Sequence, residues 1–277
     1  MTALPQELES TAPLLRSPQR TDTATTAELA LSEYDPYFYD HPLDHVPVMA
    51  LVCALFDLTR LTRPDDDPAR LALRMEFPSF CEPNADVALV HSGTALLAEQ
   101  DGEVVCSGEL NRTALPLHTV RPAPPSLRRL PADPVLVHRC DLENVLVTGM
   151  ADTGDGRVVA FREPAPGHRL GVAPDAPARP EALLDAARQF ATMLCHTEFR
   201  RPEDTRLVLL GLEADLVVGV PGGVHLRWSR TRPPRGRSRV EFTVTTSDGA
   251  ALGRIGLDCF AASPAAYRRM RGEARSA

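Results

Sequence analysis

The chain has 277 residues, of which 43% are hydrophobic and 24% charged, and its formal net charge is −7. This composition excludes a collagen-like or wholly disordered chain, and the negative charge gives no overall basic footprint for nucleic acid. No stretch approaches the roughly 20 apolar residues of a membrane span, and no signal pattern opens the sequence, so we expect a cytoplasmic protein.

The first part of the chain predicts an arm followed by a helix-and-sheet unit. Residues 1–26 are rich in Thr, Pro, Ser and Gln without periodicity, which predicts a flexible arm. Within a first unit over residues 27–113, residues 48–58 are apolar on every side and follow Pro47, as in a buried helix. Apolar alternation then predicts antiparallel strands, at residues 71–77, 87–90, 95–98 and 104–110, with a hairpin turn at Asp101-Gly102 between the last two.

The second part repeats this order after a Pro-rich linker over residues 114–134. A second unit is predicted over residues 135–272, with a short tail at 273–277. Its helix, residues 181–196, has apolar residues at helical spacing. Strands are predicted at residues 145–148, 157–162, 207–220, 223–228, 239–245 and 250–260.

The two units share one plan, in which a loop precedes a buried helix that an antiparallel sheet then covers. Cys53 and Asp185 fall at matching positions of the two helices, and Glu76 and Glu213 at similar places in the following strands. The predicted fold class is therefore α+β, a tandem double hotdog in which each half is a long buried helix wrapped by an antiparallel sheet.

Two residue types restrict the chemistry. All 30 basic residues are arginine, because the sequence contains no lysine, so Schiff-base and P-loop chemistry are excluded. The six cysteines are scattered and form no C-x-x-C pair, so neither a zinc site nor a disulfide framework is expected. We interpret them as reduced and mostly buried thiols.

Residues 38–47, FYDHPLDHVP, resemble the signature of the A-factor biosynthesis (AfsA-like) hotdog family, the γ-butyrolactone synthases of actinomycetes. The wide use of Ala, Leu, Pro and Arg is also typical of GC-rich actinobacterial genomes. Further family-like segments are VHR at 137–139, VLVT at 145–148, DAARQ at 185–189 and SPAAYRRMRG at 263–272.

Two departures from the family pattern stand out. The half with V-H-R comes first in the family and second here, a swap that two similar units of a pseudo-dimer tolerate. In the first unit Val48, Cys53 and Asp57 stand where the family has Gly, Glu and Gln. The second helix has Asp185 in place of the family Glu.

The resemblance implies an acyltransferase that moves a β-ketoacyl chain from acyl carrier protein to a hydroxyl of dihydroxyacetone phosphate. The resulting ester then cyclises toward a butenolide or butyrolactone, without a metal or redox cofactor. The implied partners are acyl carrier protein and a phosphate-bearing alcohol, with no nucleic acid or membrane, and a homodimer is compatible with the pattern. The alternatives are a hotdog dehydratase or thioesterase acting on carrier-protein or CoA thioesters, or a non-catalytic acyl-binding partner.

Acyl transfer needs a base for the attacking hydroxyl and donors for the oxyanion. His41 and His45 precede the first helix, and a neutral imidazole suits the base role. We expect one composite catalytic site in which His41 or His45 meets Asp185 from the second helix, with helix amides after Pro47 facing the oxyanion. The expected substrate-binding residues are Asp44, Pro47, His138, Arg139, His168, Arg188 and Gln189.

Each of these residues has another interpretation. His41 and His45 could brace the loop while Asp40 and Asp44 cap helix amides, or the run could hold a metal. Arg188 binds a substrate phosphate or braces a carboxylate. The pair His138 and Arg139 either contacts a ligand or has a structural role at the start of a strand. Cys53 is either a nucleophile or a small apolar residue of the helix. A reciprocal site that paired His168 with Cys53 would be degenerate.

Overall fold

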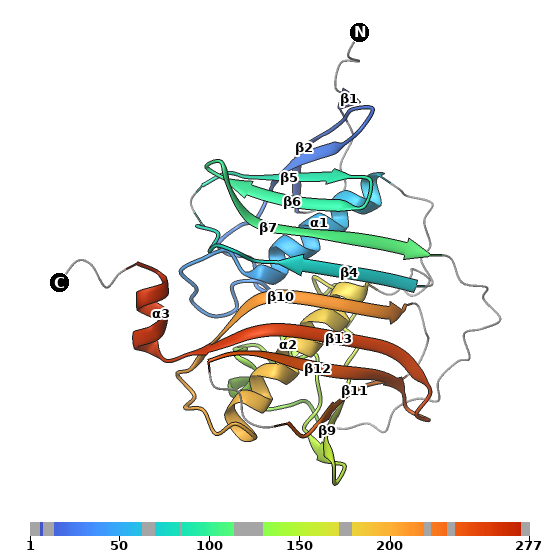
Figure 1. Cartoon of the computed structure of the whole chain (residues 1–277), viewed down its shortest axis with the longest axis vertical. Helices are drawn as coiled ribbons and strands as arrows, with labels where there is room; N and C mark the ends of the chain where they lie inside the picture. The colour runs from blue at the N-terminus through green and yellow to red at the C-terminus, as the bar shows by residue number, and fades with distance from the viewer. Residues whose placement is uncertain are drawn as a thin grey trace.

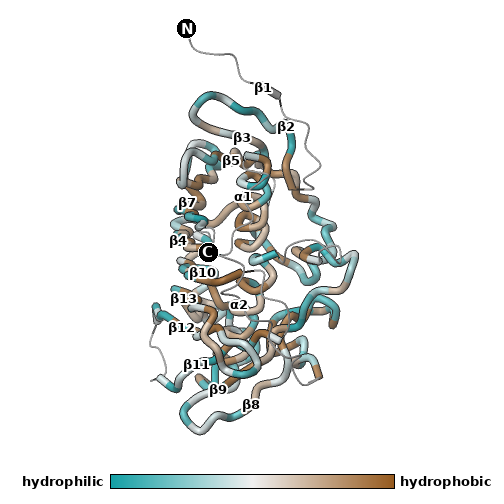
Figure 2. Tube along the Cα trace, turned by 90° about the vertical axis from the view of Figure 1, so that its right-hand side faces the viewer, coloured by the Kyte–Doolittle hydropathy of each residue, from teal (hydrophilic) through white to brown (hydrophobic). Residues whose placement is uncertain are grey.

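The computed structural model describes residues 14–62, 70–83, 85–113, 130–171, 179–218, 223–231 and 236–272, and the backbone of residues 6–7. Two helices lie side by side against one face of a single antiparallel sheet (Figure 1). Figure 2 shows the sheet from its edge, with both helices on the same side of it. None of the helices in the described ranges is long and apolar enough to cross a membrane.

The first unit consists of one helix, α1, and the strands that surround it. Its elements are β1 (Gln6–Glu7), β2 (Leu15–Arg20), β3 (Thr25–Leu29), α1 (Val48–Thr62), β4 (Arg70–Glu76), β5 (Val87–Ser92), β6 (Ala95–Gln100) and β7 (Glu103–Thr113). The turn between β6 and β7 has positive φ at both Asp101 and Gly102, 51° and 80°, which matches the hairpin predicted there.

The second unit repeats the plan around α2 and adds a short helix at its end. Its elements are two 3-10 turns, η2 (Pro134–Val137) and η3 (Leu142–Asn144), then β8 (Ala151–Asp152), β9 (Gly156–Ala160), α2 (Pro180–Thr197), β10 (Arg206–Val217), β11 (Val224–Ser229), β12 (Arg237–Thr246), β13 (Ala251–Ala262) and α3 (Pro264–Met270). The predicted strand at 145–148 is present only as isolated bridges, Val147 to Phe161 and Pro131 to Thr148.

The two units join through β4 and β10, which pair antiparallel from Gly211–Glu76 to Val217–Arg70. The sheet order is β1-β2-β3-β5-β6-β7-β4-β10-β13-β12-β11-β9-β8. Along β4 the side chains alternate between exposed and buried, so Leu71, Leu73 and Met75 face the helices. The core therefore lies between the sheet and the two helices.

The burial of α1 explains its sequence. Every residue from Met49 to Thr59 is buried, which accounts for a helix that is apolar on all sides. In contrast, α2 also buries polar side chains, among them Glu181, Asp185 and Gln189, each 0% exposed. Buried charges are tolerated only where they are paired and hydrogen-bonded, so these residues locate polar networks inside the fold.

The structure corrects the prediction of a flexible arm over residues 1–26. Residues 14–26 include β2 and the first two residues of β3, and β3 pairs with β5 in the main sheet. Few apolar residues of this hairpin become buried, chiefly Leu14, Leu15 and Ala27, and most of its other residues are polar. The remaining predicted arm has only β1 described, and most of the predicted linker and the whole predicted tail lie outside the described residues.

Candidate functional site

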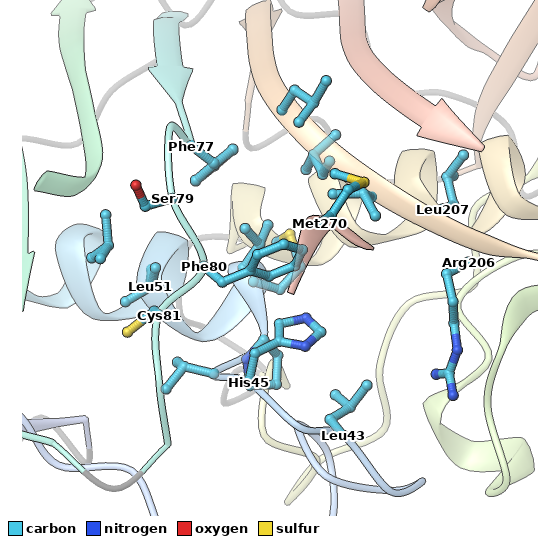
Figure 3. Close-up of a pocket in the computed structure, with 18 of the residues that line it drawn as sticks. Leu43, His45, Leu51, Phe77, Ser79, Phe80, Cys81, Arg206, Leu207 and Met270 are labelled. Carbon is cyan, nitrogen blue, oxygen red and sulfur yellow. The ribbon is translucent and has the colours of Figure 1, made fainter. Parts of the chain in front are cut away.

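A pocket of about 560 Å³ lies where the two units meet (Figure 3). Its walls come from the loop before α1, the segment after β4, the start of β10, and α3. Much of the lining is apolar, which suits an acyl chain. Representative apolar lining residues are Leu43, Leu51, Phe77, Phe80, Leu207 and Met270.

Imidazole and guanidinium groups gather at the polar end of this pocket. His41, His45 and His138 line it together with Arg139 and Arg188. A second pocket of about 570 Å³ adjoins the first, because both are lined by His41, His138, Arg139, Arg206 and Tyr267. The two predicted bases, His41 and His45, thus line the first of two adjoining chambers, and His41 also lines the second.

His45 is held by a carboxylate and a phenol. Its Nδ1 lies 2.8 Å from Asp44 Oδ1 and 3.0 Å from the Tyr267 hydroxyl, which itself donates to Asp44 at 2.6 Å. Burial lowers the pKa of His45. Burial opposes ionisation of Asp44, but hydrogen bonds from Tyr267 and His45 lower the pKa of that carboxyl to about 2.

His41 forms a second pair with a carboxylate. Its Nδ1 lies 2.7 Å from Asp40 Oδ1, and the Asp40 side chain is only 2% exposed. Asp40 also accepts from the Asn144 amide at 3.2 Å. Burial opposes ionisation of Asp40, yet the bond to His41 and the charge of Arg139 lower its pKa.

These contacts assign the protons of both imidazoles. An ionised carboxylate only accepts hydrogen bonds, so Nδ1 carries the hydrogen in His41 and in His45. In the neutral form of either ring, Nε2 is therefore unprotonated. That tautomer is the form in which a carboxylate-supported imidazole can take a proton.

Asp185 does not line either pocket, although its catalytic role was predicted. It is 0% exposed and accepts four hydrogen bonds, from the Tyr37 hydroxyl at 2.6 Å, Arg139 Nη2 at 2.8 Å, Arg188 Nε at 2.6 Å and Gln189 Nε2 at 2.8 Å. Burial opposes ionisation, but Arg188 and Arg139 hold the pKa of this carboxyl well below its ordinary value. The structure therefore corrects the expectation that this carboxylate meets His41 or His45 across a substrate.

The two arginines bound to Asp185 differ in whether their terminal nitrogens are free to bind a ligand. Arg139 is 4% exposed, and its terminal nitrogens already bond Asp185, Asp40 and the Tyr37 carbonyl. Arg188 uses only Nε on Asp185 and is 22% exposed. Among the described residues its terminal amino groups have no partner, so Arg188 can bind an anion in the pocket.

Two other residues predicted to bind substrate instead form their hydrogen bonds with other protein groups. Gln189 accepts from the Leu146 amide at 2.8 Å and donates to the Asn144 carbonyl at 2.9 Å, besides its bond to Asp185. His168 bonds Asn144 Oδ1 through Nε2 at 3.1 Å and accepts from the Leu170 amide through Nδ1 at 3.0 Å. Neither residue lines the pockets, so the structure corrects their prediction as substrate contacts.

The remaining predicted binding residues do lie at the site. Pro47 lines the first chamber and Asp44 the second. His138 lines both chambers, and its Nε2 lies 2.9 Å from Nε2 of His196. His196, in the last turn of α2, also bonds the Arg201 carbonyl through Nδ1 at 3.2 Å.

The reciprocal site with Cys53 is absent from the described residues. Cys53 is 1% exposed and burial raises its pKa well above the ordinary value, so it is not an activated nucleophile. Beside it on α1 and α2 lies a network of ion pairs. Arg60 bonds Asp57 at 2.9 Å and Glu181 at 2.7 Å, while Arg179 bonds Asp57 at 2.6 Å.

Sequence reasoning missed three residues of the site. Tyr37 lies one residue before the recognised run, and Tyr267 lies inside the family-like segment at 263–272 without a role assigned to it. Arg206 opens β10 and lines both chambers, and it forms no ion pair with a described carboxylate. No sequence signal distinguishes Arg206 from the other exposed arginines.

The metal interpretation of the D-H-x-x-D-H run finds no cluster to support it. Asp40 pairs with His41, and Asp44 with His45, as two separate contacts. Across the described ranges no group of three or more His, Cys, Asp and Glu side chains converges as metal ligands would.

Comparison with solved structures defines the fold as hotdog-like. The dehydratase domain of RzxB from Pseudomonas fluorescens superposes with a TM-score of 0.65 at 14% identity, over 92% of this chain and 100% of that one. The dehydratase domain of the CurJ module of curacin polyketide synthase gives 0.60 at 12% identity, over 92% and 98%. A bifunctional dehydratase-cyclase domain from ambruticin biosynthesis gives 0.56 at 16% identity, over 95% and 100%.

The family follows from the sequence itself. The model of the A-factor biosynthesis hotdog domain, AfsA, matches residues 122–262, about half of the chain. This protein therefore belongs to the AfsA family, and the matched region contains α2 and its sheet. No curated protein sequence matches the chain.

Proposed function

We propose that this protein is a tandem double-hotdog acyltransferase, which moves a β-ketoacyl chain from acyl carrier protein to the hydroxyl of an anionic alcohol such as dihydroxyacetone phosphate. One observation carries the proposal. Two carboxylate-supported imidazoles and the cations Arg188 and Arg206 line one pocket together with apolar side chains. The imidazoles suit the deprotonation of an alcohol, and the guanidinium groups suit its phosphate.

The chemistry of the transfer follows from this arrangement. Nε2 of His41 or His45 takes the hydroxyl proton as the alcohol oxygen attacks the thioester carbonyl. Val48 and Met49, in the first turn of α1, line the pocket, and their amides have no intrahelical acceptor, so they can stabilise the oxyanion. Collapse forms the ester C–O bond and breaks the C–S bond, and the imidazolium returns its proton to the departing thiolate.

The environment of Asp185 favours transfer over dehydration. A hotdog dehydratase that used this carboxyl would need it protonated, to deliver a proton to the departing β-hydroxyl. Here Arg139 and Arg188 keep it ionised, and Tyr37 and Gln189 occupy its remaining lone pairs. Its role in the proposal is to position Arg188, so it enters as a positioning residue.

A thioesterase would use the same imidazoles with water as the acceptor. Arg206 and the terminal amino groups of Arg188 favour an anionic alcohol, because water needs no guanidinium to bind it. Incubating the protein with β-ketoacyl carrier protein, with and without dihydroxyacetone phosphate, separates the two activities. Mass detection of a phosphate-bearing ester supports the proposal, and formation of the free acid alone at the same rate in both samples contradicts it.

A further inference from the structure

His138 and His196 form an imidazole pair beside both chambers. Their Nε2 atoms lie 2.9 Å apart, and their ring planes are tilted by 47°. His138 ends η2 in the left-handed region, with φ 52° and ψ 55°, a conformation that costs a non-glycine residue free energy. His196 comes from the last turn of α2, so the pair connects two separate elements at the pocket wall.

The protons of this pair can be assigned by elimination. Nδ1 of His196 lies 3.2 Å from the Arg201 carbonyl, which can only accept, so Nδ1 carries a hydrogen. The neutral His196 ring then has a bare Nε2, and the close Nε2 of His138 must donate to it. The neutral His138 ring is therefore unprotonated at Nδ1.

The surroundings oppose an extra proton on His138. Arg188 and Arg206 act on this ring electrostatically in the same sense as His196 and His41, and all four lower its pKa. Burial, His196 and Arg188 together lower the pKa of His138 to about 3. His138 thus stays neutral at ordinary pH and is a poor general base for the hydroxyl proton.

We infer that His138 is a binding residue for the acceptor alcohol, which accepts a hydrogen bond from a hydroxyl at Nδ1, and that His196 is the positioning residue that fixes this tautomer. The alcohol-binding part rests on the proposed function. His138 lines both chambers together with Arg206, so a ligand with a hydroxyl at one end and an anionic group at the other reaches both side chains. The pair then favours a hydroxyl donor over a group that can only accept.

The tautomer is measured directly by ¹⁵N NMR of histidine-labelled protein. We expect His138 to be protonated at Nε2 and bare at Nδ1, and His196 to be protonated at Nδ1. Protonation of His138 at Nδ1 in the wild-type protein overturns the inference. This measurement needs no enzymatic turnover, so its outcome is distinct from that of the transfer assay.

Ligand binding is read from the same resonances. Titration with dihydroxyacetone phosphate should shift the Nδ1 signal of His138, whereas inorganic phosphate should leave it in place. An unchanged signal at a concentration that saturates the protein overturns the alcohol-binding role. A shift without ester formation would keep the binding site and reject the proposed transfer.

Variants of His196 test the positioning role. His196→Phe keeps a ring but removes the acceptor, and loss of the fixed tautomer should raise KM for the alcohol by about tenfold, the value of one hydrogen bond of roughly 1.4 kcal/mol. His196→Gln keeps an acceptor oxygen, so its KM for the alcohol should stay close to the wild-type value. KM for the acyl donor should be unchanged in both variants. His225→Phe on β11, outside both pockets, is the matched control. Equal alcohol KM in wild type and His196→Phe contradicts the positioning role.

Discussion

The replacement Asp185→Asn tests whether this carboxylate supports the site or acts on substrate. It removes the charge that compensates Arg139, which is 4% exposed and keeps only Asp40 at 3.5 Å as a second carboxylate. It also turns an amide NH₂ toward donors, because Asp185 accepts from Tyr37, Arg139, Arg188 and Gln189. Removal of one partner of a buried ion pair costs about 3–5 kcal/mol.

We therefore expect the free energy of unfolding to fall by about 3–5 kcal/mol and Tm by roughly 10 °C in a protein of this size. Urea titration followed by circular dichroism measures the first quantity and calorimetry the second. Asp215→Asn is the matched control, because Asp215 forms an exposed pair with Arg70 and should cost about 1 kcal/mol or less. If Asp185→Asn kept wild-type stability but lost turnover, the reasoning would be refuted, and Asp185 would instead act on the substrate as an acid.

Three further outcomes are expected. If His41 or His45 is the base, replacing that residue with Gln should lower the transfer rate about 10²–10⁴-fold. Wild-type rates in both His41→Gln and His45→Gln would contradict an imidazole base. Tyr267→Phe removes the hydroxyl that bonds Asp44 and His45 and should lower kcat about fivefold, the value of ~1 kcal/mol, whereas Arg269→Gln on the same helix should not. If His45 is the base, its lowered pKa places the acid limb of kcat/KM below pH 6.5, and a limb above pH 6.5 would contradict a buried neutral His45.

The lowered pKa of His138 also sets the sign of its contribution to the pH dependence of stability. His138 has a folded pKa of about 3 against an ordinary value of 6.5, so the unfolded chain takes up the proton first as pH falls. The stability associated with neutral His138 is therefore complete above pH 6.5 and is lost between about pH 6.5 and pH 3. Urea midpoints measured across this range should fall, and they should fall less in His138→Phe.

Local patterns in the sequence predicted the elements well. The all-round apolar run after Pro47 predicted a buried helix, and the structure buries α1 from Met49 to Thr59. Alternation from Leu71 predicted β4, and Asp101-Gly102 predicted the β6–β7 turn. The hairpin of β2 and β3 was missed because it buries few apolar residues, and its pairing with β5 depends on distant residues.

The site was predictable only where a loop sequence carried its residues together. His41 and His45 share one segment, each beside its own carboxylate, and both line the pocket. The contacts of Asp185 with Tyr37 and Arg139 could not be predicted, because these residues lie 148 and 46 positions away in sequence and meet it only in the folded protein. Tyr267 likewise reaches Asp44 across 223 positions.

The central claim is that the imidazoles and cations of one site transfer an acyl group to an alcohol. Its most direct test presents β-ketoacyl and β-hydroxyacyl carrier-protein thioesters together with dihydroxyacetone phosphate in H₂¹⁸O, followed by mass analysis of all products. We predict a phosphate-bearing β-ketoacyl ester whose two ester oxygens carry no ¹⁸O, because one comes from the thioester carbonyl and the other from the alcohol. An ¹⁸O-labelled free acid as the main product, or an enoyl thioester formed by loss of water, would contradict the account.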